Sequence, residues 1–427
     1  MNNLANKILR KCSFIYQRLN NTLVFLDQGI VSFGNFLVSI TILRFLGIEI
    51  FGIFSFFWLI LLLINNIQIS YIISPMLTNA PKQSISNISY FYGGIFIQQL
   101  IFTLIIFLFT FFILKFLGNY VLAFQFERFH LSFSLLIVVT QFHQFFRRLL
   151  FSKKFYYKNL IIDFITYFVL IFLIIYLNFL NKLNLESVLW SFVCAFISGI
   201  LINIPIIFSL NYKFKNTYKS IVENWIIAKW LLLTSLLQWF SGNLWIMNAG
   251  LILGPYTLGI IRACQTLLNI SNIIFQSIEN FIPGTVSKKY ISGGVKEMQL
   301  YLKEFTKKFF MMILIIILVV IFFSKILLNT VYGTETGSYY QLLIFLALII
   351  PIHLFQYPPT YGLRALGKTK PIFISYLFSC IFTLLVSKFT ITYFKVPGLI
   401  FGLYSTQLII IFILYFKYYQ ILKKKKK

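Results

Sequence analysis

The sequence predicts an all-α polytopic membrane protein with about twelve transmembrane helices, arranged in two parallel six-helix halves around a central cavity. The composition is the first observation: 59% of the 427 residues are hydrophobic and 11% are charged. Soluble domains carry about 45–50% apolar and about 25% charged residues, and a single soluble core could not hide 52 Phe. This composition excludes a soluble enzyme, a disordered chain and a nucleic-acid-binding module.

Apolar runs of spanning length are the second observation. Backbone polar groups in lipid must be satisfied within the segment, so each run is expected to be a helix. Glycine and proline mark several boundaries between runs, among them Gly47, Gly254 and Pro397. The predicted spans are 23–46, 50–77, 89–114, 120–146, 159–180, 187–210, 225–252, 257–282, 305–328, 339–361, 372–393 and 397–416.

The placement of basic residues is the third observation. With the N-terminus in the cytoplasm, 29 of the 37 Lys and Arg fall in segments on the inner side and 8 fall on the outer side. This alternation follows the positive-inside rule for twelve spans. The net charge of +27 is therefore a topology signal, and we expect a multi-pass protein of the bacterial inner membrane with both termini cytoplasmic.

Five regions follow from these patterns. Leu4, Ile8 and Cys12 begin a helical apolar face in the N-terminal segment, which we expect to lie on the inner leaflet. The C-terminal lysines are expected to contact anionic lipid. The predicted regions are an amphipathic segment at 1–22, a six-helix bundle at 23–210, a cytoplasmic linker at 211–224, a second bundle at 225–417 and a basic tail at 418–427.

An internal repeat links the two halves. The segment from Leu46 to Gly52 resembles the segment from Leu253 to Gly259 at an offset of 207 residues. Both segments lie between the first two helices of a six-helix half, which indicates duplication. Two parallel halves would enclose a cavity between them, where transporters bind their substrates.

Ionisable residues inside spans cost at least about 2.5–3.5 kcal/mol on an insertion scale, so each needs a reason. Asp27 and Asn35 lie near one small, polar face of the first span. Asp27 could bind a proton or a cation there, or could pair with a Lys near the inner headgroups. Glu127 and His130 share a face of the fourth span and form a second candidate protonation site; the alternative is a local ion pair at the outer interface.

The candidates for binding an anionic or polar headgroup are Asn35, Arg44, Arg128 and Arg262. Arg44 could instead extend its charge to the outer interface. His143 and His353 are expected to be core or interfacial residues, whereas Asp163 and Glu279 are expected to be interfacial, near inner helix ends. The sequence contains no catalytic constellation, metal-ligand spacing or nucleotide-binding loop, so neither enzymatic activity nor a cofactor is expected.

With these features in place, the chain resembles the multidrug/oligosaccharidyl-lipid/polysaccharide flippase superfamily. It is most similar to the bacterial polysaccharide branch, the O-antigen and exopolysaccharide flippases. The resemblance covers nearly the whole chain and rests on 27–29 with Asn35, 44–47, 51–52, 253–259 and 364–371. The density of cavity arginines seen in the peptidoglycan-precursor branch is not obvious here.

The resemblance implies a V-shaped cavity, alternating access and transport of a polyprenyl-pyrophosphate-linked oligosaccharide from the inner to the outer leaflet for lipopolysaccharide or other surface-polysaccharide biosynthesis. It also implies basic residues for the pyrophosphate and acids for ion coupling, and Asp27 matches the placement of such an acid in the drug-exporting branch. Expected partners are the lipid-linked substrate and membrane lipids, with a monomer acting alone or beside polysaccharide assembly proteins. The alternatives are a cation-coupled multidrug or metabolite exporter, and a membrane polysaccharide polymerase or glycosyltransferase.

Overall fold

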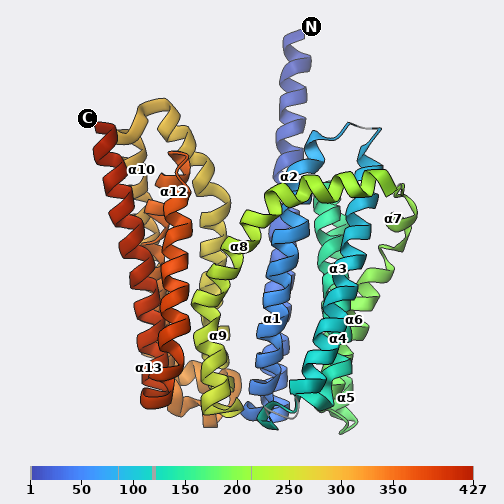
Figure 1. Ribbon diagram of the computed structural model, residues 1–427, viewed down its shortest axis with the longest axis vertical. Helices are drawn as coiled ribbons and strands as arrows, with labels where there is room; N and C mark the ends of the chain where they lie inside the picture. The colour runs from blue at the N-terminus through green and yellow to red at the C-terminus, as the bar shows by residue number, and fades with distance from the viewer. Residues whose placement is uncertain (1, 85, 118–121, 213, 427) are drawn as a thin grey trace. The chain divides into compact units, whose positions relative to one another are not determined.

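The computed structural model describes the backbone of residues 2–84, 86–117, 122–212 and 214–426, and no strand occurs in these ranges. The all-α prediction is therefore confirmed, and the predicted apolar runs are mainly helical where the structure describes them (Figure 1). The helices are α1 Asn2–Gln68, α2 Ser74–Asn79, α3 Ile88–Leu117, α4 Phe126–Ser152, α5 Tyr156–Phe179, α6 Leu185–Leu201, α7 Ile204–Phe208, α8 Phe214–Leu253, α9 Pro255–Leu268, α10 Ile270–Tyr332, α11 Tyr340–Leu354, α12 Tyr357–Ala365 and α13 Lys370–Lys426. Shorter turns are the π-helix η1 Ile69–Ile73 and the 3₁₀ turns η2 Ala80–Lys82, η3 Leu122–Phe124 and η4 Thr334–Tyr339.

Helix α13 contains two predicted spans, and α1 and α10 each contain one predicted span and part of another. Non-helical backbone divides α1 at Gly47, α10 at Gly293 and Gly294, and α13 at Lys395. Eight stretches of the described chain are long and apolar enough to cross a bilayer, and these merged helices account for several of them. The predicted linker at 211–224 is mostly helical, because α8 begins at Phe214.

The fourth span begins later than predicted, and this shift matters for the site. Gln125 has a left-handed backbone (φ 49°) and follows a 3₁₀ turn, so α4 begins at Phe126 and runs to Ser152. Arg147, expected in the connection after residue 146, therefore lies inside the helix. It is 7% exposed.

The chain divides into two compact units. The first unit contains residues 1–46 and 64–232, and the second contains residues 47–63 and 233–427. Within the first unit, apolar side chains of α3 and α4 pack around Ile72, Phe96 and Phe145. Within the second unit, a larger apolar core gathers around Ile278, Ile313 and Leu414.

The repeated turns have the same backbone geometry. Gly47 has φ 84° and ψ 172°, and Gly254 has φ 88° and ψ 170°. A Cβ atom on Gly52 would lie 1.8 Å from the carbonyl oxygen of Pro255, and one on Gly259 would lie 2.2 Å from that of Ile48. Gly52 and Gly259 are related by the offset of 207, and so are Ile48 and Pro255. The two contacts are therefore equivalent, and the two turns pack against each other through a local two-fold relation.

Candidate functional site

A buried charge cluster joins three helices of the first unit. Arg147 of α4 donates from its Nη2 atom to Oδ2 of Asp27 on α1 at 2.9 Å. Its Nε atom lies 2.7 Å from Oδ2 of Asp163 on α5. The three side chains are at most 8% exposed. We call this group the Asp27–Arg147–Asp163 cluster.

Small residues allow the helices to approach closely around the cluster. A Cβ on Gly34 of α1 would lie 2.3 Å from the Tyr167 ring, and one on Gly199 of α6 would lie 2.4 Å from the Thr166 hydroxyl. Small-residue faces of this kind permit tight packing of membrane helices. Asn35 lies beside Tyr167, to which it is hydrogen-bonded. The predicted polar face of the first span therefore packs against α5.

His143 extends the cluster by one turn of α4. Its Nε2 atom lies 3.6 Å from Oδ1 of Asp163 and 3.3 Å from the Thr166 hydroxyl. The ring packs edge-on against Phe196 at 4.8 Å, and the residue is 2% exposed. His143 is therefore a core residue, as expected, and α5 places the Asp163 carboxylate beside it.

Buried amides form a second polar network in the same unit. Gln68 donates to Gln99 at 2.9 Å and to the carbonyl of Gln141 at 2.7 Å. Asn79 and Asn224 are hydrogen-bonded at 3.2 Å. Buried polar groups with satisfied partners fix how helices pack in the absence of water.

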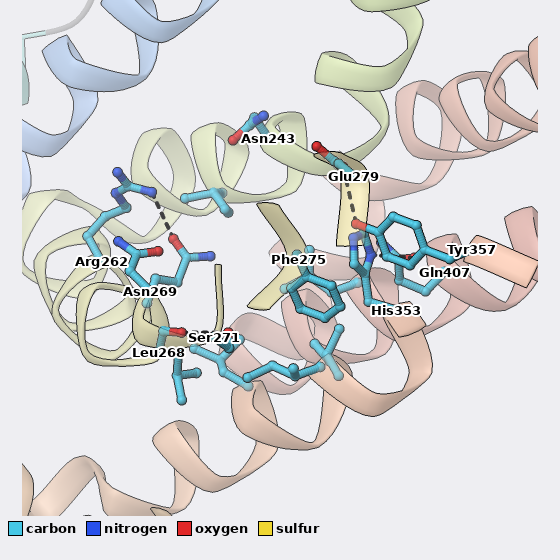
Figure 2. A pocket seen from close by; sticks show the side chains of 16 residues that line it. Asn243, Arg262, Leu268, Asn269, Ser271, Phe275, Glu279, His353, Tyr357 and Gln407 are labelled. Atoms are coloured by element: carbon cyan, nitrogen blue, oxygen red, sulfur yellow. Dashed lines mark hydrogen bonds between the residues drawn. The ribbon is translucent and has the colours of Figure 1, made fainter. Parts of the chain in front are cut away.

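The second unit contains a cavity of about 540 Å³ with a mixed polar and aromatic lining. This volume lies within the range of small-molecule sites, about 300–1,000 Å³. Figure 2 shows Arg262 and Asn269 at one end and Glu279 with Tyr357 at the other. The lining residues are Asn243, Ile246, Arg262, Gln265, Leu268, Asn269, Ser271, Phe275, Glu279, Leu346, Ile349, Ile350, His353, Tyr357, Leu403 and Gln407.

Arg262 defines the basic end of this cavity. Its half-buried guanidinium donates to Oε1 of Gln265 at 2.9 Å. Within the described part of the chain, no carboxylate forms an ion pair with Arg262. A guanidinium that has no carboxylate partner retains N–H donors for an anion. Its planar fork matches the geometry of phosphate and carboxylate oxygens.

Aromatic rings and one carboxylate define the other end. Phe275 and Tyr357 are stacked with ring centroids 5.6 Å apart, and His353 lies edge-on to both. The Tyr357 hydroxyl donates to Oε1 of Glu279 at 3.3 Å. Glu279 itself is exposed and faces the cavity (Figure 2). Aromatic ring faces beside a carboxylate attract organic cations.

The remaining predicted residues lie apart from both groups. Arg128 forms an exposed ion pair with Glu186 at 3.9 Å, with side chains 59% and 44% exposed. Nδ1 of His130 is hydrogen-bonded to the backbone carbonyl of Glu127, so the contact does not involve the carboxylate. Arg44 is exposed near the end of the first span.

The sequence alone did not reveal that Arg147 and Asp163 belong to a buried charge cluster. The former was counted among loop charges, and the latter was expected at the interface. One signal was present: His143 and Arg147 are four residues apart and share a helical face.

The fold is that of known membrane transporters. The MatE family model matches residues 231–389, less than half of the chain. An inward-facing multidrug resistance MATE family transporter of the MOP superfamily superposes with a TM-score of 0.73 at 11% identity, covering 91% of this chain and 95% of its own. No curated protein matches the sequence.

Two further solved structures share this fold. The inward closed conformation of lipid II flippase MurJ superposes with a TM-score of 0.69 at 14% identity, covering 93% of this chain and 87% of its own. The Vibrio cholerae MATE transporter VcmN gives 0.63 at 16% identity, with 96% and 98% covered. The likeness therefore includes both drug transporters and a lipid flippase.

Proposed function

We propose that the protein is a membrane transporter of the flippase type, which moves a polyprenyl-pyrophosphate-linked oligosaccharide from the inner to the outer leaflet by alternating access. Such a headgroup cannot cross about 30 Å of hydrocarbon unaided, because its charge would be unpaired there. The observation that carries the proposal is Arg262, a half-buried guanidinium with no carboxylate partner in the described residues, at one end of a polar cavity of about 540 Å³.

The rest of the cavity suits a carbohydrate. Asn243, Gln265 and Gln407 offer amide donors and acceptors, and the faces of Phe275 and Tyr357 offer apolar surface for sugar rings. The fold shared with lipid II flippase MurJ supports a lipid-linked substrate. We expect the protein to act in the bacterial inner membrane, with both termini in the cytoplasm, in surface-polysaccharide biosynthesis.

Reconstituted vesicles test this function. A fluorescent polyprenyl-diphosphate oligosaccharide should change leaflets in vesicles that contain the protein, and Arg262→Gln should reduce the rate at least about tenfold, which corresponds to about 1.4 kcal/mol of lost interaction. Arg128→Gln is the matched control, because its guanidinium is exposed and already paired with Glu186. Equal rates in wild type, Arg262→Gln and empty vesicles would refute the proposal.

The aromatic end of the cavity favours a second candidate, export of organic cations. Glu279 beside Phe275 and Tyr357 would attract a lipophilic cation, and one of the similar structures named above is a multidrug resistance transporter. Efflux of a fluorescent cation that is lost in Glu279→Gln and retained in Arg262→Gln would favour this alternative. The reverse pattern with the lipid-linked substrate would favour the flippase.

A further inference from the structure

The cavity of the second unit carries one charge of each sign. Among its described lining residues, Arg262 is the only Lys or Arg and Glu279 is the only Asp or Glu. Figure 2 shows the two side chains at opposite ends of the cavity. They are 17 residues apart along α9 and α10, which corresponds to at most about 25 Å of helix. One extended ligand can therefore contact both charges.

The end of the cavity at Arg262 suits an anion. Gln265 accepts one hydrogen bond from the guanidinium at 2.9 Å, and no carboxylate of the described residues pairs with the remaining N–H groups. The neighbouring lining residues Asn269 and Ser271 are uncharged. A phosphate at this end would find N–H donors and no repelling charge.

The end of the cavity at Glu279 suits a cation. The Tyr357 hydroxyl donates to Oε1 of Glu279 at 3.3 Å, and Oε2 accepts no hydrogen bond from the described residues. The carboxylate is exposed and lies beside the stacked rings of Phe275 and Tyr357 (Figure 2). A carboxylate and aromatic rings together attract an ammonium group and disfavour a second anion.

Arg364 of α12 is the cation whose charge reaches this end of the cavity. The charges of Arg364 and Glu279 both act on Tyr361 and Tyr376. The two side chains nevertheless form no ion pair, because the guanidinium of Arg364 lies over the Tyr361 ring at 5.8 Å. Arg364 does not line the cavity, so it lowers the electrostatic cost of Glu279 without occupying the carboxylate.

His353 is the third ionisable group at this end, and its hydrogen bonds suit a neutral ring. Its Nε2 atom lies 2.9 Å from the side-chain nitrogen of Gln356, and its Nδ1 atom lies 3.3 Å from Oε1 of Gln407. In a neutral imidazole, one nitrogen accepts and the other donates, which matches this pair of contacts. The lining therefore keeps one positive and one negative charge.

A metal ion does not suit the Glu279 end. Hard cations need several oxygen ligands that converge on one point. In the described ranges, no group of three or more His, Cys, Asp and Glu side chains is placed to hold a metal ion. An ammonium group needs fewer ligands, because one carboxylate and the adjacent rings can bind it.

We propose that the headgroup carried by this protein is zwitterionic, with its phosphate bound at Arg262 and a free amino group of its sugar part bound at Glu279. This inference rests on the proposed function and deepens it by naming the substrate class, a lipid-linked sugar that keeps an unacylated amine. Neutral sugars would leave the carboxylate without a partner, and an acidic sugar would be repelled by it. Glu279 is therefore the specificity-determining residue of the cavity, and Arg262 is the phosphate anchor.

Three soluble probes test the charge of the sugar. Each is a citronellyl diphosphate disaccharide, and they differ at one position, which carries an amine, an acetamide or a carboxylate. Isothermal titration calorimetry measures their affinities for the protein in nanodiscs. At neutral pH the wild type should bind the amino probe about fivefold more tightly than the acetamido probe, and the carboxylate probe most weakly. Equal affinities for the amino and acetamido probes would overturn the inference.

Substitution of Glu279 locates this preference. Glu279→Gln keeps the shape of the side chain and removes its charge, so the preference for the amino probe should disappear while the affinity for the acetamido probe stays at the wild-type level. Glu304→Gln is the matched control and should keep the preference, because Glu304 is an exposed glutamate of α10 that does not line the cavity. A preference that survives in Glu279→Gln would overturn the role assigned to this residue.

Substitution of Arg262 tests the other end. Arg262→Gln should weaken the amino and acetamido probes by the same factor, because both carry the diphosphate. An unchanged affinity for the amino probe would overturn binding at two points. The wild-type comparison needs no substitution, so it remains decisive if a variant does not fold.

Binding is measured without transport, so the two proposals fail separately. A protein that prefers the amino probe but moves no lipid-linked sugar would refute the proposed function alone. A protein that flips a lipid-linked sugar and binds the amino and acetamido probes equally would refute the present inference alone.

Discussion

The two units of the molecule differ in whether the charged side chains on their helices are paired. In the first unit, Asp27 and Asp163 both form ion pairs with Arg147, at 2.9 and 2.7 Å. In the second unit, Arg262 and Glu279 lie in one cavity without an ion-pair partner among the described residues. Paired charges hold their helices in one packing arrangement, whereas an unpaired charge beside a cavity can bind a ligand.

This difference arose between halves that share a repeated turn. At the offset of 207 residues, the position of Asp27 corresponds to Thr234, and the position of Arg262 corresponds to Ser55. Neither charged group has a charged equivalent in the other half. The sequence likeness at this offset therefore does not extend to Asp27 or Arg262.

Loss of Arg147 should produce the largest effect. Arg147→Met leaves two buried carboxylates uncompensated, and breaking such a buried pair costs about 3–5 kcal/mol. Denaturant or SDS titration of the purified protein measures the free energy of unfolding. Combining Arg147→Met with Asp27→Asn and Asp163→Asn should recover at least half of the loss, and no recovery would show that the charges are not the cause.

The repeated glycines should give the next effect, equal in the two halves. Gly52→Ala and Gly259→Ala each place a Cβ against a backbone carbonyl, at 1.8 and 2.2 Å, and overpacking of this kind costs about 1–3 kcal/mol. Gly29→Ala is the matched control, since nothing lies within 4 Å of its Cβ position. Clearly unequal losses at Gly52 and Gly259 would contradict the local two-fold relation.

Arg262 should matter much less for stability than Arg147. Arg262→Met leaves no described carboxylate without its partner, so we expect a change below about 1 kcal/mol in the free energy of unfolding. The same titration compares the two variants directly. A loss as large as that of Arg147→Met would reveal an internal partner for Arg262 and would remove the contrast between the units.

The exposed ion pair should give the smallest effect. Arg128 and Glu186 are 3.9 Å apart and about half exposed, and such surface pairs contribute about 0–1 kcal/mol. Arg128→Gln should leave the thermal midpoint within experimental error at physiological salt. A clear destabilisation would mean that this outer pair also holds helices together.

Much of the fold could be predicted because a lipid bilayer permits few backbone structures. Apolar length alone locates helices, and Gly47 and Gly254 mark turns that require positive φ. Asp27 and Arg262 stood out because a charge inside an apolar run is visible in the sequence. Their opposite surroundings, one paired and one open, were not visible.

The cluster itself could not be predicted because its partners are distant in sequence. Arg147 and Asp27 are 120 residues apart, and hydropathy carries no information about which helices touch. A boundary error added to this: the fourth span begins six residues later than predicted, about 9 Å along a helix. That shift moved Arg147 from an expected connection into the interior.

The π-helical turn at Ile69–Ile73 sets the angular phase of everything that follows it on its helix. Such a turn contains one residue more than an α-helical turn, and these insertions recur at functional positions. Deleting one residue there would rotate the next segment by about 100° and turn Asn79 away from Asn224. The hydrogen-bonded amide of Gln68 precedes this turn, and that of Asn79 follows it. Both amides can face the interior of the unit because the π-helical turn adds one residue between them.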